Sequence, residues 1–222
     1  LESMRPRLSA LRQKISESGA HQPSLQGPFA TENQLALARK LADAVGYDWN
    51  SGRLDLSVHP FSSGTAGDAR ITTRVDPDEP LGCLYSTVHE LGHALYEQGI
   101  SDGMDFSPVA HHVSMGVHES QSRLWENQIA RSRPFCQWLY PHFIDAFGEC
   151  GVSDSEALYR AVNRVETGFI RTESDEVHYN LHVLLRFELE RDLISGALDV
   201  VDLEEEWNTR FLRDFGVSVP DA

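Results

Sequence analysis

Two histidines and a glutamate in the run His89-Glu90-Leu91-Gly92-His93 have the residue types and spacing of a zinc site. Four residues of α-helix turn through about 400°, so His89 and His93 would project from nearly the same face, about 6 Å apart along the axis. Two neutral imidazoles placed in this way can hold one Zn²⁺. Glu90 would be close enough to take a proton from a water on the metal without being a ligand. The run therefore predicts the centre of a metal-dependent hydrolase.

The surrounding sequence predicts the helix that this chemistry requires. The motif fixes only three residues, so its context has to decide whether it is real. Asp78 and Glu79 precede the run 80–98, and acidic residues suit a helix N-terminus. Gly99 follows the run as a stop signal. The apolar positions within it recur at helical spacing: Leu84, Val88, Leu91 and Leu95.

A catalytic zinc site needs a third protein ligand and an open fourth position. A third histidine six residues after His93 is absent, because Gly99 occupies that place. A glutamate on a second helix is the other solution, and Glu119 is the leading candidate. It lies 119 − 93 = 26 residues after His93, which leaves room for a loop and a returning helix. Glu126 and Glu97 compete for the role, but Glu97, one turn beyond His93, is expected to orient a ligand or face solvent.

Five motifs occur along the chain in a specific order. They are His59-Pro60-Phe61, Asp68-Ala69-Arg70-Ile71-Thr72, His89-Glu90-Leu91-Gly92-His93, His118-Glu119-Ser120-Gln121-Ser122-Arg123 and Ile170-Arg171-Thr172-Glu173-Ser174-Asp175-Glu176. In this order the chain resembles the thermostable-type zinc carboxypeptidases, peptidase family M32. The resemblance spans roughly residues 1 to 222 but less than half of a typical member, and that family's Gly-x-x-Gln-Asp-x-His-Trp motif is missing. We therefore expect a piece of a longer or processed enzyme.

The resemblance implies a mainly α fold, with a zincin-like helical catalytic core and a small β-sheet beside the HExxH helix. It implies a zinc-dependent metallocarboxypeptidase with one Zn²⁺ per chain, or Co²⁺ in its place, held by His89, His93 and Glu119. The substrates would be peptides with a free C-terminus. Members of the family are typically homodimers, so a homodimer is expected.

A carboxypeptidase must recognise the terminal carboxylate of its substrate, and two arginines lie in the matching motifs. A guanidinium binds a carboxylate through two parallel hydrogen bonds. The resemblance assigns this role most directly to Arg171, whereas Arg70 can be structural through Asp68 or line the cleft. A surface salt bridge is the alternative for both arginines. His59 is expected near the substrate, or to be part of a turn that its neighbouring proline fixes.

Peptide hydrolysis also needs a donor aimed at the oxyanion, and zinc proteases commonly use a tyrosine or histidine. Tyr179 matches the family's tyrosine after Arg171 and ranks above His178, with a packed core tyrosine as the alternative. In the predicted mechanism Glu90 takes the proton of the attacking water and delivers it to the leaving amine. A zinc oligopeptidase that cleaves internal bonds and an inactive, zinc-stabilised helical fragment remain open as alternatives.

The composition is that of a globular protein. A chain of 222 residues, 41% hydrophobic and 24% charged, is long enough for one domain, and we expect a single catalytic domain over 1–222. The net charge of 19 − 34 = −15 argues against nucleic acids and anionic membranes as partners. No membrane-length apolar run or signal-peptide pattern occurs, which favours the cytoplasm. Cys83, Cys136 and Cys150 form no CxxC pair and are expected to be reduced packing thiols.

Helical patterns dominate the chain. A capping-box pattern at 31–34 opens a helix that closes near Gly46, and a second capping box is predicted at 153–156. Further helices are expected at 5–17, 80–98, 111–131, 135–147, 154–166, 175–195 and 203–215. Two alternating stretches, 54–58 and 69–75, predict short strands. A small sheet beside the zinc helix would offer a peptide an edge with which to pair.

Overall fold

The described residues form a mainly helical structure, which agrees with the predicted fold class. The computed structural model describes residues 2–19, 23–65, 67–100 and 107–220. The chain divides into two compact units, a larger one over 23–162 and a smaller one that combines the N-terminal segment with 163–222. Each unit has its own core, so we describe the two separately. The expectation of one catalytic domain over 1–222 stays a prediction.

The larger unit contains five α-helices and three strands among its described residues. The helices are α2 (Thr31–Ala44), α3 (Pro80–Gln98), α4 (Met115–Arg123), α5 (Arg133–Phe147) and α6 (Ser155–Val162). The strands are β1 (Leu54–Leu56), β2 (Ser62–Thr65) and β3 (Asp68–Thr73). A π-helical segment, Leu124–Ile129, continues α4.

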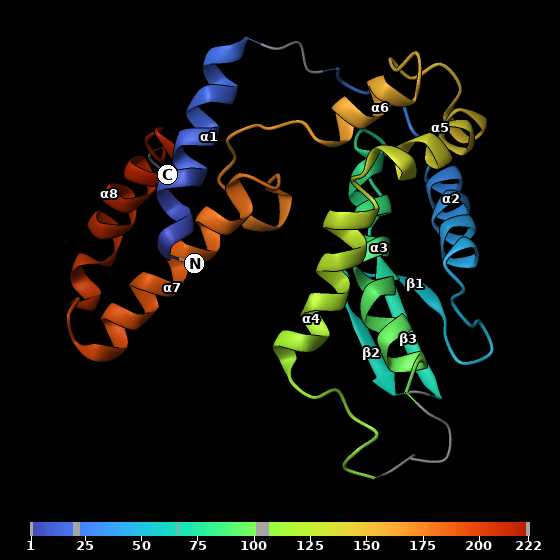
Figure 1. Ribbon diagram of the computed structural model, residues 1–222, viewed down its shortest axis with the longest axis horizontal. Helices are drawn as coiled ribbons and strands as arrows, with labels where there is room; N and C mark the ends of the chain where they lie inside the picture. The colour runs from blue at the N-terminus through green and yellow to red at the C-terminus, as the bar shows by residue number, and fades with distance from the viewer. Residues whose placement is uncertain (1, 20–22, 66, 101–106, 221–222) are drawn as a thin grey trace. The chain divides into compact units, whose positions relative to one another are not determined.

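The three strands form a small mixed sheet in the order β1-β3-β2 (Figure 1). The central strand β3 pairs in parallel with β1 and antiparallel with β2, so that Ile71 lies between Leu54 and Ser62. Ile71 is fully buried. Because β2 is an edge strand, one row of its backbone groups has no partner strand in this sheet. The expected small sheet beside the zinc helix is therefore present.

Helix α3 is the element around which the larger unit packs. It contacts β3, β2, α2 and α4, and Figure 1 shows it between the sheet and α4. The side chain of Glu79 caps its N-terminus by accepting from the Gly82 amide. The periodic positions Leu84, Val88 and Leu91 are at most 2% exposed, as their spacing predicted. Burying these side chains against the sheet and α2 is the main reason that this helix is stable.

A buried hydroxyl cluster fixes α3 against the end of β3. The side chain of Thr73 is completely buried, and its hydroxyl lies 2.8 Å from Ser86 Oγ and 3.0 Å from Thr87 Oγ1. It also donates to the carbonyl oxygen of Cys83 at 3.1 Å. Buried polar groups keep their stability cost low only when they are hydrogen-bonded in this way. The cluster therefore fixes the register of the helix on the sheet.

Several element boundaries differ from the predictions. The helix expected at 111–131 begins only at Met115, because Ser114 is extended and its side chain caps the helix by accepting from the Val117 amide. The helix expected at 154–166 ends at Val162. Strand β2 was not predicted, since its sequence Ser-Ser-Gly-Thr has neither alternation nor strong strand formers.

The two capping boxes were also placed incorrectly. Thr31 is the first helical residue rather than the cap of α2, and no side chain caps this helix. The amide of Gln34 instead donates to the carbonyl oxygens of Phe29 and Asp76, which ties α2 to the segment before α3. At α6 the cap is Asp154, one residue later than expected, whose carboxylate accepts from the Ala157 amide at 2.7 Å.

Among its described residues, the smaller unit contains three α-helices, α1 (Arg5–Ser18), α7 (His178–Ser195) and α8 (Leu203–Phe215). Its core consists of five buried side chains: Leu181, Leu185, Leu189, Phe211 and Phe215. Beside it, Arg5 forms salt bridges of 2.6 Å with Glu188 and 3.3 Å with Asp214, two nearly buried carboxylates. These ion pairs join α1 to both of the other helices.

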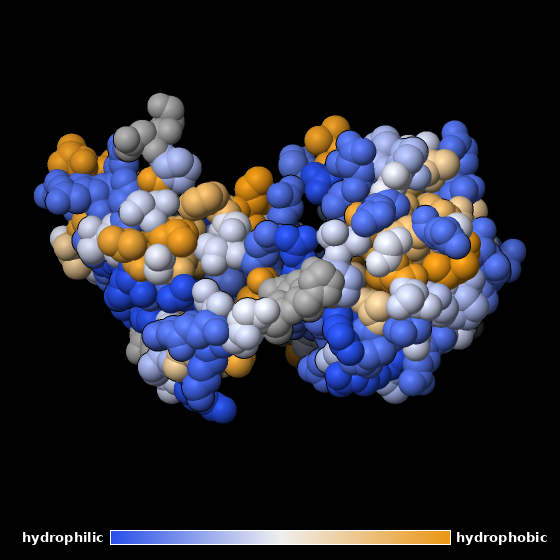
Figure 2. All heavy atoms as spheres, turned by 90° about the horizontal axis from the view of Figure 1, so that it is seen from above, coloured by the Kyte–Doolittle hydropathy of each residue, from blue (hydrophilic) through white to orange (hydrophobic). Residues whose placement is uncertain are grey.

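Much of the visible surface is hydrophilic. Figure 2 shows a face on which hydrophilic residues surround smaller groups of hydrophobic ones. Among the described residues, no helix combines the length and the apolar character that crossing a membrane requires. The three cysteines are free and buried, as expected for packing thiols.

At Gly92, helix α3 lies very close to the backbone of α4. A Cβ at this position would lie 2.5 Å from Ser122 Cα, 2.7 Å from the Gln121 carbonyl oxygen and 2.8 Å from the Ser122 amide nitrogen. All three atoms belong to the backbone, which cannot move aside as a flexible side chain can. The approach of the two helices therefore depends on a residue without a side chain.

We predict that Gly92→Ala destabilises the protein by about 1–3 kcal/mol, the usual range for overpacking, even though alanine is the better helix former. The added methyl group has to push α4 away from α3. Denaturant unfolding measures the change. The matched control is Gly116→Ala in α4, where the nearest atom to the new Cβ is 3.9 Å away. It should be neutral or stabilise by up to about 1 kcal/mol, and equal effects of the two substitutions would contradict the prediction.

Candidate metal centre

The side chains of His89, His93 and Glu119 converge on one point between α3 and α4. One donor atom from each residue lies within 4.8 Å of the others. Nε2 of His93 is 3.3 Å from Oε2 of Glu119, and Nε2 of His89 is 3.8 Å from the same oxygen. The two imidazole rings are 5.0 Å apart and nearly perpendicular, as expected for residues one turn apart.

These distances fit a tetrahedral metal ion. Two ligand atoms that are each about 2.0–2.1 Å from such an ion lie about 3.3–3.4 Å apart. The separation of 3.3 Å between His93 and Glu119 matches this value, and the 3.8 Å of His89 is slightly longer. Two imidazoles and one carboxylate are also a donor set that zinc commonly uses in catalysis, with one position left open. The residues present therefore fit a catalytic divalent ion.

Glu126 holds His89 in position from its other side. Its Oε2 lies 2.8 Å from Nδ1 of His89 and accepts a bond of 3.1 Å from the guanidinium of Arg123. With Nδ1 donating to this carboxylate, Nε2 keeps its lone pair for a metal. Such a carboxylate behind a ligating histidine fixes the tautomer and the ring orientation. Glu126, considered above as a ligand, thus contacts the nitrogen of His89 that faces away from Glu119.

The two glutamates that contact the histidines, Glu119 and Glu126, have lowered pKa values. Burial opposes the charged form of His89, but the hydrogen bond and charge of Glu126 raise the pKa of His89. Burial likewise opposes ionisation of Glu126, yet His89 and Arg123 hold its pKa below the ordinary value. Burial also opposes ionisation of Glu119, but the hydrogen bond and charge of His93 lower its pKa. Both glutamates are therefore anionic at neutral pH.

Glu90 has the opposite character. It is only 6% exposed and lies on the side of α3 that faces the sheet, near the hydroxyl of Ser62 on β2. Burial raises the pKa of Glu90, and the neighbouring imidazoles of His89 and His93 offset only part of this effect. A carboxyl group whose pKa is raised in this way is suited to accept and return a proton. The prediction that Glu90 is a base and not a ligand is compatible with this position.

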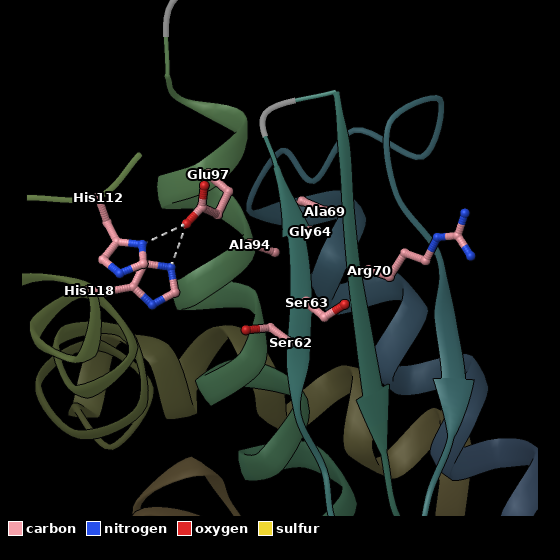
Figure 3. Close-up of a pocket in the computed structure, with 9 residues that line it drawn as sticks. All are labelled: Ser62, Ser63, Gly64, Ala69, Arg70, Ala94, Glu97, His112 and His118. Atoms are coloured by element: carbon pink, nitrogen blue, oxygen red, sulfur yellow. Dashed lines mark ion pairs between the residues drawn. The ribbon is translucent and has the colours of Figure 1, made fainter. Parts of the chain in front are cut away.

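A cavity of about 180 Å³ lies beside the metal centre in the same unit. Three residues that lie close together are part of its wall (Figure 3). Glu97 is at the end of α3, His112 precedes α4, and His118 is on α4. The rings of His118 and His93 stack at 4.4 Å with an angle of 20° between their planes. Through this ring contact the cavity adjoins His93, one of the predicted ligands.

Two residues predicted to bind substrate in this unit are exposed. Arg70 is in β3, and its guanidinium makes two hydrogen bonds to Asp68, of 2.7 and 2.8 Å. In Figure 3 it points away from the histidines that line the cavity. This is the structural role through Asp68 considered above. His59 is exposed, and its carbonyl oxygen accepts from the Ser57 hydroxyl at 2.7 Å. Roles of Arg70 and His59 in substrate binding stay predictions.

Arg171 and Tyr179 belong to the smaller unit and contact each other. Nη1 of Arg171 donates to the phenol oxygen of Tyr179 at 2.8 Å, and the guanidinium lies 5.5 Å from the centre of the tyrosine ring. No ion pair in the described part of the chain involves Arg171. Asp175 anchors the segment between them by bonding the Val177 amide at 2.8 Å and Nδ1 of His178 at 2.7 Å. Arg171 and Tyr179 are thus held together.

Sequence reasoning missed part of this centre. The role of Glu126 was hidden because its orienting contact is with a residue 37 positions away. Its spacing of seven residues from Glu119, about two helical turns, was the available signal that both lie on one face. The association of Glu97 with His112 and His118 had no such signal, because His112 precedes the helix.

The chain is similar to known metallopeptidases. The sequence model of a family described as "Carboxypeptidase Taq (M32) metallopeptidase" matches residues 1–222. Thermostable carboxypeptidase 1 of Thermus thermophilus is 42% identical over 217 residues, which are 96% of this chain and 42% of that protein. The chain therefore spans less than half the length of this relative.

Solved structures show the same similarity. Metallocarboxypeptidase 1 of Trypanosoma cruzi aligns with a TM-score of 0.93 at 36% identity, over 98% of this chain and 46% of that one. An M32 carboxypeptidase from Deinococcus radiodurans aligns with a TM-score of 0.90 at 43% identity, over 99% of this chain and 46% of that one.

We predict that Glu126→Ala weakens metal binding by about 10–100-fold, the usual effect of removing a carboxylate that orients a histidine ligand. The loss should appear in a competition titration of the metal-free protein with Zn²⁺ and a chromophoric chelator. Glu126→Gln, which can still accept a hydrogen bond from His89, should recover part of the affinity. Parent-like affinity in Glu126→Ala would contradict the orienting role.

Proposed function

The chain belongs to the carboxypeptidase Taq (M32) metallopeptidase family, and we propose that it forms the catalytic region of a zinc-dependent carboxypeptidase. Membership confirms the resemblance that the five motifs predicted. The observation that carries the proposal is the convergence of His89, His93 and Glu119 beside the buried Glu90. Because the chain spans 42% of the Thermus thermophilus relative, the activity, substrates and partners of the whole protein are part of the proposal.

The donor set supports zinc as the metal. Imidazole nitrogen and carboxylate oxygen suit Zn²⁺, and Co²⁺ can take the same positions. When bound, such an ion supplies Lewis acidity and a water of lowered pKa. His89 and His93 would hold it from α3, and Glu119 from α4. The hydrogen bond from Glu126 keeps the ligating nitrogen of His89 directed at the centre.

Glu90 acts as the proton carrier of the reaction. Its carboxylate accepts a proton from the attacking water and later delivers it to the nitrogen of the leaving amine. Burial favours the uptake of this proton, because a carboxyl group with a raised pKa binds a proton more readily than an exposed one. A general base of this kind typically contributes about 10²–10⁴ to the rate.

Arg171 binds the terminal carboxylate of the peptide, and Tyr179 supports it or donates to the oxyanion. The guanidinium already donates to the tyrosine hydroxyl and stays near its ring, which reduces the number of conformations that it can adopt. Arg70 and His59 are proposed to line the approach to the site. Peptides with a free C-terminus are then the substrates.

The cellular setting completes the proposal. Three free, buried cysteines fit a reducing compartment such as the cytoplasm. The homodimer that we propose rests on the family resemblance alone. A net charge of −15 disfavours nucleic acids and anionic membranes as partners.

Two alternatives predict different products. An oligopeptidase with the same metal centre would cleave internal bonds and accept a peptide whose C-terminus is amidated. A metal-stabilised region without catalysis would bind zinc and release no amino acid. Incubation of the protein with matched free-acid and amide peptides, together with metal analysis, separates all three.

We predict that Glu90→Gln lowers turnover by at least about 10²-fold while leaving metal content nearly unchanged, because it removes the base and no ligand. Timed release of C-terminal amino acids and elemental analysis measure the two effects. The matched variant Glu119→Gln should instead lose most of its metal. Activity of Glu90→Gln within about tenfold of the parent is too high for the loss of a general base and would refute its assignment.

We also predict that Arg171→Met lowers kcat/KM for free-acid peptides by about 10–100-fold, since hydrogen bonds to a charged group contribute about 1.5–3 kcal/mol. Rates with amidated peptides, already low, should change little. Arg164→Met is the control, because Arg164 is an exposed arginine of the same unit that is paired with Glu166. Equal losses for acid and amide would show that Arg171 does not read the carboxylate.

A further inference from the structure

Glu97, His112 and His118 form a second cluster of metal-ligating side chains, which we call the auxiliary cluster. One donor atom from each residue lies within 4.8 Å of the others. Oε1 of Glu97 is 2.9 Å from Nε2 of His118 and 3.4 Å from Nδ1 of His112. In Figure 3 both imidazoles approach the same carboxylate oxygen. The cluster has the same donor set as the first centre, two imidazoles and one carboxylate.

Glu97 and His118 form a close contact within the auxiliary cluster. Nε2 of His118 is buried and makes no hydrogen bond of acceptable geometry to any described residue, although Glu97 is only 2.9 Å away. A buried polar nitrogen without a partner is costly. Two ligands of one tetrahedral ion lie about 3.3–3.4 Å apart, somewhat farther than the 2.9 Å between Glu97 and His118. The 3.4 Å between Glu97 and His112 matches that spacing.

The cavity provides the remaining coordination positions. Glu97, His112 and His118 are on its wall, opposite Ser62 and Ser63 of β2. Its volume of about 180 Å³ exceeds the space of a few water molecules, so water can complete the coordination of an ion bound there. The carboxylate is 12% exposed and the two imidazoles are 36% and 17% exposed, which leaves an entry path from solvent.

The auxiliary cluster is separate from the first centre but adjacent to it. Glu97 follows His93 by four residues, one turn or about 6 Å along α3. His118 precedes Glu119 in the chain, and its ring stacks on that of His93 at 4.4 Å. No residue is shared between the two donor sets. Two like-charged ions at this distance repel each other, so the second should bind more weakly than the first.

We propose that Glu97, His112 and His118 form a second site for a divalent transition-metal ion, of the class of Zn²⁺ or Co²⁺. Imidazole nitrogen with one carboxylate selects such ions over Mg²⁺ or Ca²⁺, which prefer oxygen ligands. A bound ion ties the segment before α4 to the end of α3 and thereby supports the helix that carries Glu119. The site goes beyond the proposed peptidase function, because it uses neither Glu90 nor Glu119.

Counting bound ions tests this second site without an activity assay. Metal-free protein is titrated with Zn²⁺ against a chromophoric chelator, and the zinc retained at saturation is measured by elemental analysis. We expect two ions per parent chain and one per chain in His112→Ala. Glu97→Gln, which keeps the size of the side chain, should also retain one ion.

His111→Ala is the matched control, because His111 is the adjacent and exposed histidine and belongs to neither set. It should retain two ions, and Glu119→Gln should lose the tighter ion while keeping the weaker one. A failure of the proposed function therefore leaves this result unaffected. Circular dichroism confirms that each variant is folded. The same number of ions in the parent and in His112→Ala, or equal losses in His111→Ala and His112→Ala, would overturn the proposal.

Discussion

The contact of Gly92 with the backbone of Ser122 is the constraint on which the metal centre depends. It lets α4 come so close to α3 that a Cβ on Gly92 would overlap with that backbone. Ser122 is fully buried there, and its hydroxyl donates to the carbonyl oxygen of Glu119 at 2.7 Å. The same contact therefore fixes the helix that carries Glu119 and the distance from Glu119 to His93. A wider separation would leave two histidines without their third ligand.

Around this contact the structure gives three glutamates different properties. Glu119 is half-exposed and anionic, which suits a ligand that must meet an ion arriving from solvent. Glu126 is more buried and is held anionic by His89 and Arg123, which suits an orienting partner. Glu90 is the most buried, and its pKa is raised. Their chemistry is the same, so burial and neighbours alone separate their roles.

The helical stretch after Ser114 provides a carboxylate near each ring nitrogen of His89. Glu119 is on α4, while Glu126 is on the π-helical segment Leu124–Ile129 that continues it. Such π-helical segments are rare and occur frequently at functional sites, where the extra residue per turn redirects side chains. Here the change from α-helix to π-helix falls between Glu119, which faces Nε2 of His89, and Glu126, which contacts Nδ1.

The sequence by itself predicted most of the helices and the pairing of His89 with His93, because both depend on local spacing. The apolar repeat of Leu84, Val88 and Leu91 predicts α3, and the same period places His89 and His93 on one face. Glu119 followed from the family motif and from the need for a third ligand. The bounds of the helix at 80–98 were predicted correctly.

Only the tertiary structure decided the features that depend on contacts between distant segments. Strand β2 exists because β3 offers it a hydrogen-bonding edge, although its own residues are poor strand formers. Glu126 was one of three possible ligands until packing placed it at the far nitrogen of His89. His112 lies outside any helix, so no periodicity linked it to Glu97 and His118. Periodicity reports which residues share a face, whereas the distance between two faces is set by how the helices pack.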